Sequence, residues 1–153
     1  MTGKIYWAVW LATGVALAAC DGGPKSGRGF TLPEGDIAAG EAAFVQFHCT
    51  DCHAVAGRDD LREGVDPVMT VTLGGRTTRI QTYGQLVTSV INPSHKISQK
   101  YIVEGVAVGD ESVMRKYNDV MTVSEMTDIV AFLQEQYELE PFTPTTYYGY
   151  SYQ

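Results

Sequence analysis

The strongest chemical signal in the sequence is a group of three residues, Cys49, Cys52 and His53, in the order C-x-x-C-H. Two thiols at this spacing can reach the two vinyl groups on adjacent edges of one porphyrin, and the histidine that follows can coordinate its iron. The pattern is the attachment signature of haem c. It predicts one covalently bound haem c, held through Cys49 and Cys52, with His53 as an axial ligand of the iron.

Other chemistries of two nearby cysteines fit the sequence less well. A redox-active C-x-x-C is expected near a βαβ pattern, and none surrounds this one. The chain has three cysteines, the third being Cys20, so a site with four cysteine ligands is excluded. A plain disulfide between Cys49 and Cys52 would leave His53 without a role.

Length and charge limit the classes of protein to consider. The 153 residues favour one compact domain, and 44% apolar residues are enough for a folded core. The formal net charge is −7, from 11 basic and 18 acidic residues, which argues against a nucleic-acid-binding protein. We expect any charged partner to present a basic patch.

The N-terminal residues form an export signal rather than part of the fold. Lys4 precedes an uncharged apolar run over residues 5–19, which is short for a membrane-spanning helix. The run ends in Leu-Ala-Ala-Cys at Cys20, and it resembles a bacterial lipoprotein signal. That resemblance implies cleavage before Cys20, acyl chains on this cysteine, and a protein anchored on the periplasmic side of an inner or outer bacterial membrane. An ordinary cleaved signal peptide is the alternative.

The remaining chain divides into a linker, a domain and a tail. Residues 20–35 are rich in glycine and proline, and they predict a flexible, lipidated tether. Residues 36–140 hold the periodic segments, and we expect them to form the haem domain. Residues 141–153 contain four of the nine tyrosines and no charge, and they predict an irregular tail that could also contact a partner.

Three helices are expected within residues 36–140. The first begins after Asp36, an N-cap candidate, and places Phe44 and Phe47 at helical spacing just before the first cysteine. A short helix covers residues 85–91 and stops at an Asn-Pro pair. The last covers residues 123–137, with apolar residues on one face.

A haem motif directly after a first helix, with an amphipathic helix at the end of the domain, resembles the class I, mitochondrial-like cytochrome c family. The resemblance covers residues 36–139 and implies an all-α fold of three to five helices around one haem. Gly40 and Phe44 match the family's first helix, and residues 128–133 match its last. In the family these helices cross closely at the glycine, so Gly40 is expected at a contact where a Cβ atom has no room.

The resemblance also implies three contacts of the haem and its histidine ligand. Pro67 stands where the family has a proline whose carbonyl accepts the Nδ1 proton of the axial histidine. Arg76, in a Gly-Arg pair, matches a guanidinium that faces a haem propionate. Tyr83 follows Thr82 where the family has a tryptophan, and its hydroxyl is expected at the same propionate.

The resemblance implies Met114 as the distal ligand, because it lies in a Met-x-x-aromatic loop just before the last helix. Three other methionines fit less well. Met69 follows Pro67 on the side of the axial histidine, Met121 stands where the family has leucine, and Met126 lies within the last helix.

Two alternatives to Met114 stay open. The segment 94–113 is longer than in short members of the family, and it contains His95, whose imidazole could ligate the iron instead. An open distal position is the other alternative.

These features predict an electron carrier rather than an enzyme. We expect a membrane-anchored monohaem cytochrome, a monomer or the subunit of a complex, that passes single electrons between respiratory or periplasmic redox partners. The alternatives are a haem subunit of a larger oxidoreductase and a five-coordinate haem enzyme or gas sensor.

Overall fold

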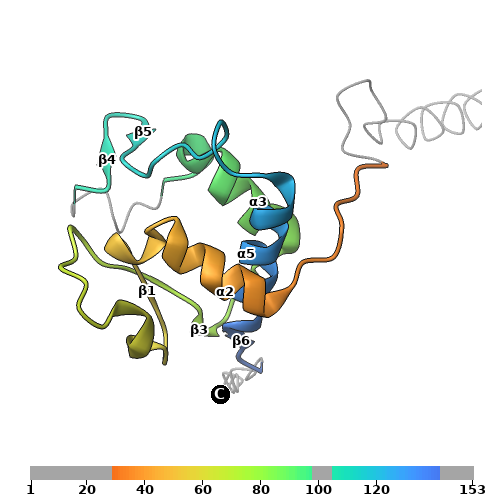
Figure 1. Ribbon diagram of the computed structural model, residues 1–153, viewed down its shortest axis with the longest axis horizontal. Helices are drawn as coiled ribbons and strands as arrows, with labels where there is room; N and C mark the ends of the chain where they lie inside the picture. The colour runs from red at the N-terminus through yellow and green to blue at the C-terminus, as the bar shows by residue number, and fades with distance from the viewer. Residues whose placement is uncertain (1–28, 98–104, 142–153) are drawn as a thin grey trace, which may run out of the picture. The chain divides into compact units, whose positions relative to one another are not determined.

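The structure is a computed structural model that describes residues 29–97 and 105–141. The chain separates into two units, Met1–Leu32 and Pro33–Gln153, and the fold described below belongs to the second. Its α-helices in the described residues are α2 (Ile37–Gln46), α3 (Tyr83–Ile91) and α5 (Val123–Glu135) (Figure 1). None of the described helices combines the length and the apolar character needed to cross a membrane. Cys20 and the residues of the predicted signal lie outside the described residues.

The crossing of α2 and α5 forms the core (Figure 1). A Cβ atom on Gly40 would collide with the main-chain carbonyl oxygen of Asp128 in α5, so only glycine allows this approach. Phe44 and Phe132 then meet with ring centroids 5.7 Å apart, and both are buried. The close crossing expected at Gly40 is therefore present.

Side chains at the helix N-termini explain where the helices begin. Asp36 caps α2 by accepting from the N–H of Ala39 at 2.8 Å. Thr122 and Glu125 form a reciprocal capping box at α5, which satisfies two N–H groups that a helix end leaves without partners. Thr82 and Gln85 form the same arrangement at α3, so this helix begins two residues earlier than the sequence predicts.

Short strands are the part of the fold that the all-α prediction omitted. The strand β1 (His53–Val55) pairs in parallel with β2 (Val71–Leu73), and β3 (Gly75–Thr77) pairs in parallel with β6 (Tyr137–Leu139). An antiparallel pair joins β4 (Ala107–Val108) to β5 (Glu111–Ser112). Each strand has two or three residues, which is too short to give a period-2 signal in the sequence.

Candidate functional site

A cavity of about 470 Å³ lies between the C-x-x-C-H segment and the chain that precedes α5. Its volume is in the usual range for a site that binds a small molecule or a cofactor. All four residues predicted to hold the haem or its iron line this cavity: Cys49, Cys52, His53 and Met114. The structure thus brings together four residues that the sequence places up to 65 positions apart.

The segment that carries the cysteines leaves α2 by an abrupt turn. His48 adopts a left-handed backbone conformation (φ 57°), which ends the helix and starts a 3₁₀ turn over Cys49–Asp51. Thr50 in this turn is buried, and the N–H of Cys52 donates to the carbonyl of Cys49. The turn places both cysteines on the cavity wall, and their thiols are free rather than joined in a disulfide.

Burial sets the protonation of the residues on this wall. Removal from water raises the pKa of the Cys49 thiol to about 12, so the sulfur is a thiol and not a thiolate at neutral pH. Burial also lowers the pKa of His53, which favours the neutral imidazole. A neutral imidazole is the form that ligates a metal.

The partner of the His53 ring differs from the one predicted. Nδ1 of His53 lies 3.4 Å from the carbonyl oxygen of Val71, whereas Pro67 is exposed and does not line the cavity. The parallel register of β1 and β2 sets His53 opposite Val71, and this explains the difference. A proton on Nδ1 that faces this carbonyl would leave Nε2 free to bind a metal.

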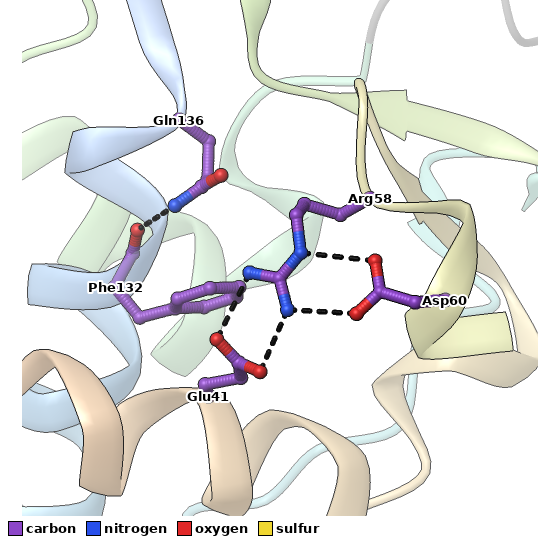
Figure 2. A network of polar contacts seen from close by, with 5 residues as sticks. All are labelled: Glu41, Arg58, Asp60, Phe132 and Gln136. Carbon is purple, nitrogen blue, oxygen red and sulfur yellow. Dashed lines mark hydrogen bonds and ion pairs between the residues drawn. The ribbon is translucent and has the colours of Figure 1, made fainter.

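A polar cluster fixes the chain as it leaves β1. Figure 2 shows the guanidinium of Arg58 between the carboxylates of Glu41, in α2, and Asp60. Two hydrogen bonds of 2.9 and 2.7 Å join Arg58 to Glu41, and two of 3.0 and 2.9 Å join it to Asp60. These bonds lower the pKa of both carboxyl groups. The cluster ties the segment after the haem motif to the first helix.

Met114 reaches the same cavity from the chain between β5 and α5. It is half-buried, and its N–H donates to the hydroxyl of Ser112 at 3.2 Å. Met121 instead packs against the core, and Met126 is buried within α5. Met69 also lines the cavity, from the segment that leads into β2, so two thioethers are available there.

Three further predicted residues, Arg76, His95 and Tyr83, do not line the cavity. Arg76 is exposed on β3, and its Nε lies 3.6 Å from Glu140, because the pairing of β3 with β6 draws it toward the end of the domain. The predicted propionate contact of Arg76 is therefore not supported by its position. His95 is exposed, its Nδ1 lies 2.8 Å from the carbonyl of Asn92, and it does not line the cavity.

Tyr83 presents an unusual polar atom. It opens α3, and its hydroxyl oxygen is buried with no hydrogen-bond partner among the described residues. A buried hydroxyl without a partner costs on the order of 1–3 kcal/mol. Such a group is suited to an acceptor that the polypeptide itself does not supply.

Three residues of functional interest were missed or undervalued from the sequence. Val71 lies in β2 opposite His53, and Met69 lies just before this strand. Strands of three residues give no pattern in the sequence from which their pairing could be predicted. Arg58 gave no signal, because its two carboxylate partners lie 17 positions before it and two positions after it.

Two thiols, a neutral imidazole and a thioether around one cavity fit a covalently bound haem, and they define a c-type haem-attachment site. A comparison with protein families matches residues 37–136 to the family described as Cytochrome c. The chain belongs to the cytochrome c family. Membership implies covalently bound haem c, and proteins of this family are generally electron carriers. Comparisons with curated proteins and with solved structures gave no match.

Proposed function

We propose that this protein is a class I, monohaem cytochrome c that transfers single electrons between redox partners. The observation that carries the proposal is that His53 and Met114 line the same cavity as the two attachment cysteines. His53 and Met114 would both hold the iron, and an iron held in this way would suit electron transfer. A five-coordinate enzyme or gas sensor would need a vacant distal position.

Each residue of the site has a distinct role in this proposal. Cys49 and Cys52 supply the thiols for two thioether bonds, which keep the cofactor attached in both oxidation states. The haem supplies the one-electron chemistry of its iron. His53 would bind the iron through Nε2 while its Nδ1 faces the carbonyl of Val71. The thioether of Met114 would favour the reduced state relative to a second histidine.

Tyr83 is proposed to donate its hydroxyl to a haem propionate. Its buried oxygen has no partner in the described chain, and a carboxylate would supply one. Arg76 is not included, because its guanidinium faces Glu140.

The membrane anchor is proposed from the sequence alone. Acylation of Cys20 would hold the protein on the periplasmic side of a bacterial membrane, with residues 20–35 as the tether. Tethering raises the effective concentration of partners on the same membrane and suits brief contacts. Loss of membrane association in a Cys20→Ala variant, measured by detergent partitioning of cell fractions, tests the anchor. A variant that stays with the membrane would contradict it.

The charge of the partner is also a proposal. The net charge of −7 favours a basic patch on the partner. However, the cavity lining holds two exposed basic residues, Lys96 and Arg115, and one acidic residue, Asp51. The opening, or mouth, of the cavity therefore has a net positive charge. The electron-transfer rate of a Lys96→Glu variant distinguishes a basic partner surface from an acidic one. A faster reaction supports a basic partner surface at the mouth, and a slower reaction supports an acidic one.

The experiment that tests the proposed function is a pair of ferric and ferrous absorption spectra for the wild type and for Met114→Ala. We expect the wild type to show the weak long-wavelength ferric band of a methionine–iron bond, and the variant to lose it and to bind carbon monoxide rapidly when reduced. Met69→Ala is the matched control and should keep the band. A Met114→Ala spectrum that equals the wild type would show that Met114 is not the ligand. Rapid carbon monoxide binding by the wild type would favour the enzyme or sensor.

A further inference from the structure

The chain that carries Met114, residues 113–122, has no regular secondary structure. At its ends, the Val113 N–H donates to the carbonyl of Val106, and Met121 packs against the core. The Met114 N–H donates to the hydroxyl of Ser112, the last residue of β5. The Asn118 side chain donates to the carbonyl of Ile91 at the end of α3. A loop of this kind positions a ligand only if further contacts fix it.

Tyr117 links the Met114 loop to the end of α2. Its hydroxyl donates to the main-chain carbonyl of Phe47 at 2.8 Å, and the two rings meet edge to face with centroids 5.7 Å apart. Phe47 is the C-cap residue of α2 and precedes Cys49 by two positions. Because His48 turns the chain out of the helix, the Phe47 carbonyl lacks the N–H partner that a longer helix would give it. Tyr117 provides that partner.

The main chain of Tyr117 is fixed as well. Its carbonyl accepts from the N–H groups of Val120 and Met121, in the turn that leads into α5. Burial raises the pKa of the Tyr117 phenol, so it stays protonated and able to donate. Tyr117 lines the cavity together with Met114, three residues before it.

We propose that Tyr117 is a positioning residue for the distal ligand. Its hydroxyl bond to Phe47 sets the distance between the Met114 loop and the segment that carries the haem cysteines. This inference rests on the proposed function, in which Met114 is the sixth ligand. It implies that the Tyr117 hydroxyl controls how firmly Met114 binds the iron, although Tyr117 itself does not touch the iron.

The test is the Tyr117→Phe variant of the haem-loaded protein, which keeps the ring and removes the hydroxyl. We measure the long-wavelength ferric band and the affinity of the ferric protein for imidazole, which competes with methionine. Loss of one net hydrogen bond predicts roughly three- to tenfold tighter imidazole binding. The pH at which the ferric band disappears should also fall.

Two controls separate positioning from general stability. Val130→Ala, a truncation in the fully buried part of α5, should lower the denaturation midpoint without changing imidazole affinity. Tyr117→Leu, which also removes the ring contact, should exceed the effect of Tyr117→Phe. Equal imidazole affinity in Tyr117→Phe and the wild type would overturn the inference, as would an equal rise in Val130→Ala.

The same measurements distinguish this inference from the function on which it rests. If Met114→Ala keeps the wild-type ferric spectrum, the ligand assignment is wrong, and the inference falls with it. If Met114→Ala loses the band while Tyr117→Phe behaves as the wild type, only the role of Tyr117 is wrong.

Discussion

The helix crossing and the walls of the cavity are held together in different ways. At the crossing, Phe44 and Phe132 are almost fully buried and Gly40 lets two main chains touch. Around the cavity, Met114 and Tyr117 are only half-buried, and single hydrogen bonds fix the loop that carries them. The first region depends on apolar burial, and the second depends on a few directional polar contacts.

This difference implies that stability and ligand geometry can be changed separately. Apolar burial at the crossing supplies free energy of folding without touching the cavity. The polar ties supply little free energy but decide where a ligand atom lies. Variants at the crossing should therefore change the free energy of unfolding more than the absorption spectrum, whereas variants of the loop should do the reverse.

The largest effect is expected for Phe44→Ala at the crossing. Removing a fully buried phenylalanine leaves a cavity and should cost about 3–5 kcal/mol in the free energy of unfolding. Denaturant titration of the haem-loaded protein measures the loss. Val45→Ala is the control in the same helix, because Val45 is 43% exposed, and it should cost less than about 1 kcal/mol. Equal losses in both variants would refute the contrast between the two faces of α2.

Gly40→Ala is expected to have the next largest effect. The added Cβ collides with the main chain at Asp128, so the helices must separate. This should lower the free energy of unfolding by about 1–3 kcal/mol. Gly84→Ala in α3 is the matched control, because nothing lies within 4 Å of its added Cβ. The free energy of unfolding of Gly84→Ala should stay within about 1 kcal/mol of the wild-type value. A Gly40→Ala protein as stable as Gly84→Ala would show that the crossing tolerates a wider separation.

The same contrast explains how much the sequence could predict. Phe44 belongs to a helix whose period is visible in the sequence, and the spacing of Cys49, Cys52 and His53 is local, so these predictions needed no tertiary information. The close crossing at Gly40 was instead implied by the resemblance to the cytochrome c family. The predictions for Pro67 and Arg76 depended on how short strands pair. Their positions follow from registers such as that of β1 with β2, which no local pattern encodes.

A moderate effect is expected at Thr122, where the Met114 loop ends and α5 begins. Its hydroxyl accepts from the Glu125 N–H, and the Glu125 carboxylate accepts from the Thr122 N–H at 2.8 Å. Thr122→Ala should cost about 1 kcal/mol in the free energy of unfolding, because a cap is lost. Thr78→Ala, at an exposed position without a cap, is the control and should change little. A spectral change as large as that of Tyr117→Phe would show that the start of α5 also positions the ligand loop.

The smallest effect is expected at Arg58, which joins the two regions by linking Glu41 of α2 to the chain after the haem motif (Figure 2). The carboxylates that it binds are well exposed, with 37% of the Glu41 side chain and 61% of the Asp60 side chain accessible, so solvent screens the ion pairs. We expect Arg58→Gln to be slightly less stable than the wild type at neutral pH, by denaturant titration. Arg79→Gln, at an exposed arginine, is the control.

The pH dependence of this difference tests its electrostatic origin. Arg58 lowers the pKa of Glu41 and of Asp60 in the folded protein, so their ionised forms stabilise the fold above the ordinary pKa of 4.5 for Glu41. As the pH falls below 4.5 and through the lowered values, both carboxylates gain protons and the contribution is lost. The stabilities of Arg58→Gln and the wild type should then converge. A difference that persists in acid would mean that the alkyl chain of Arg58, rather than its charge, joins the two regions.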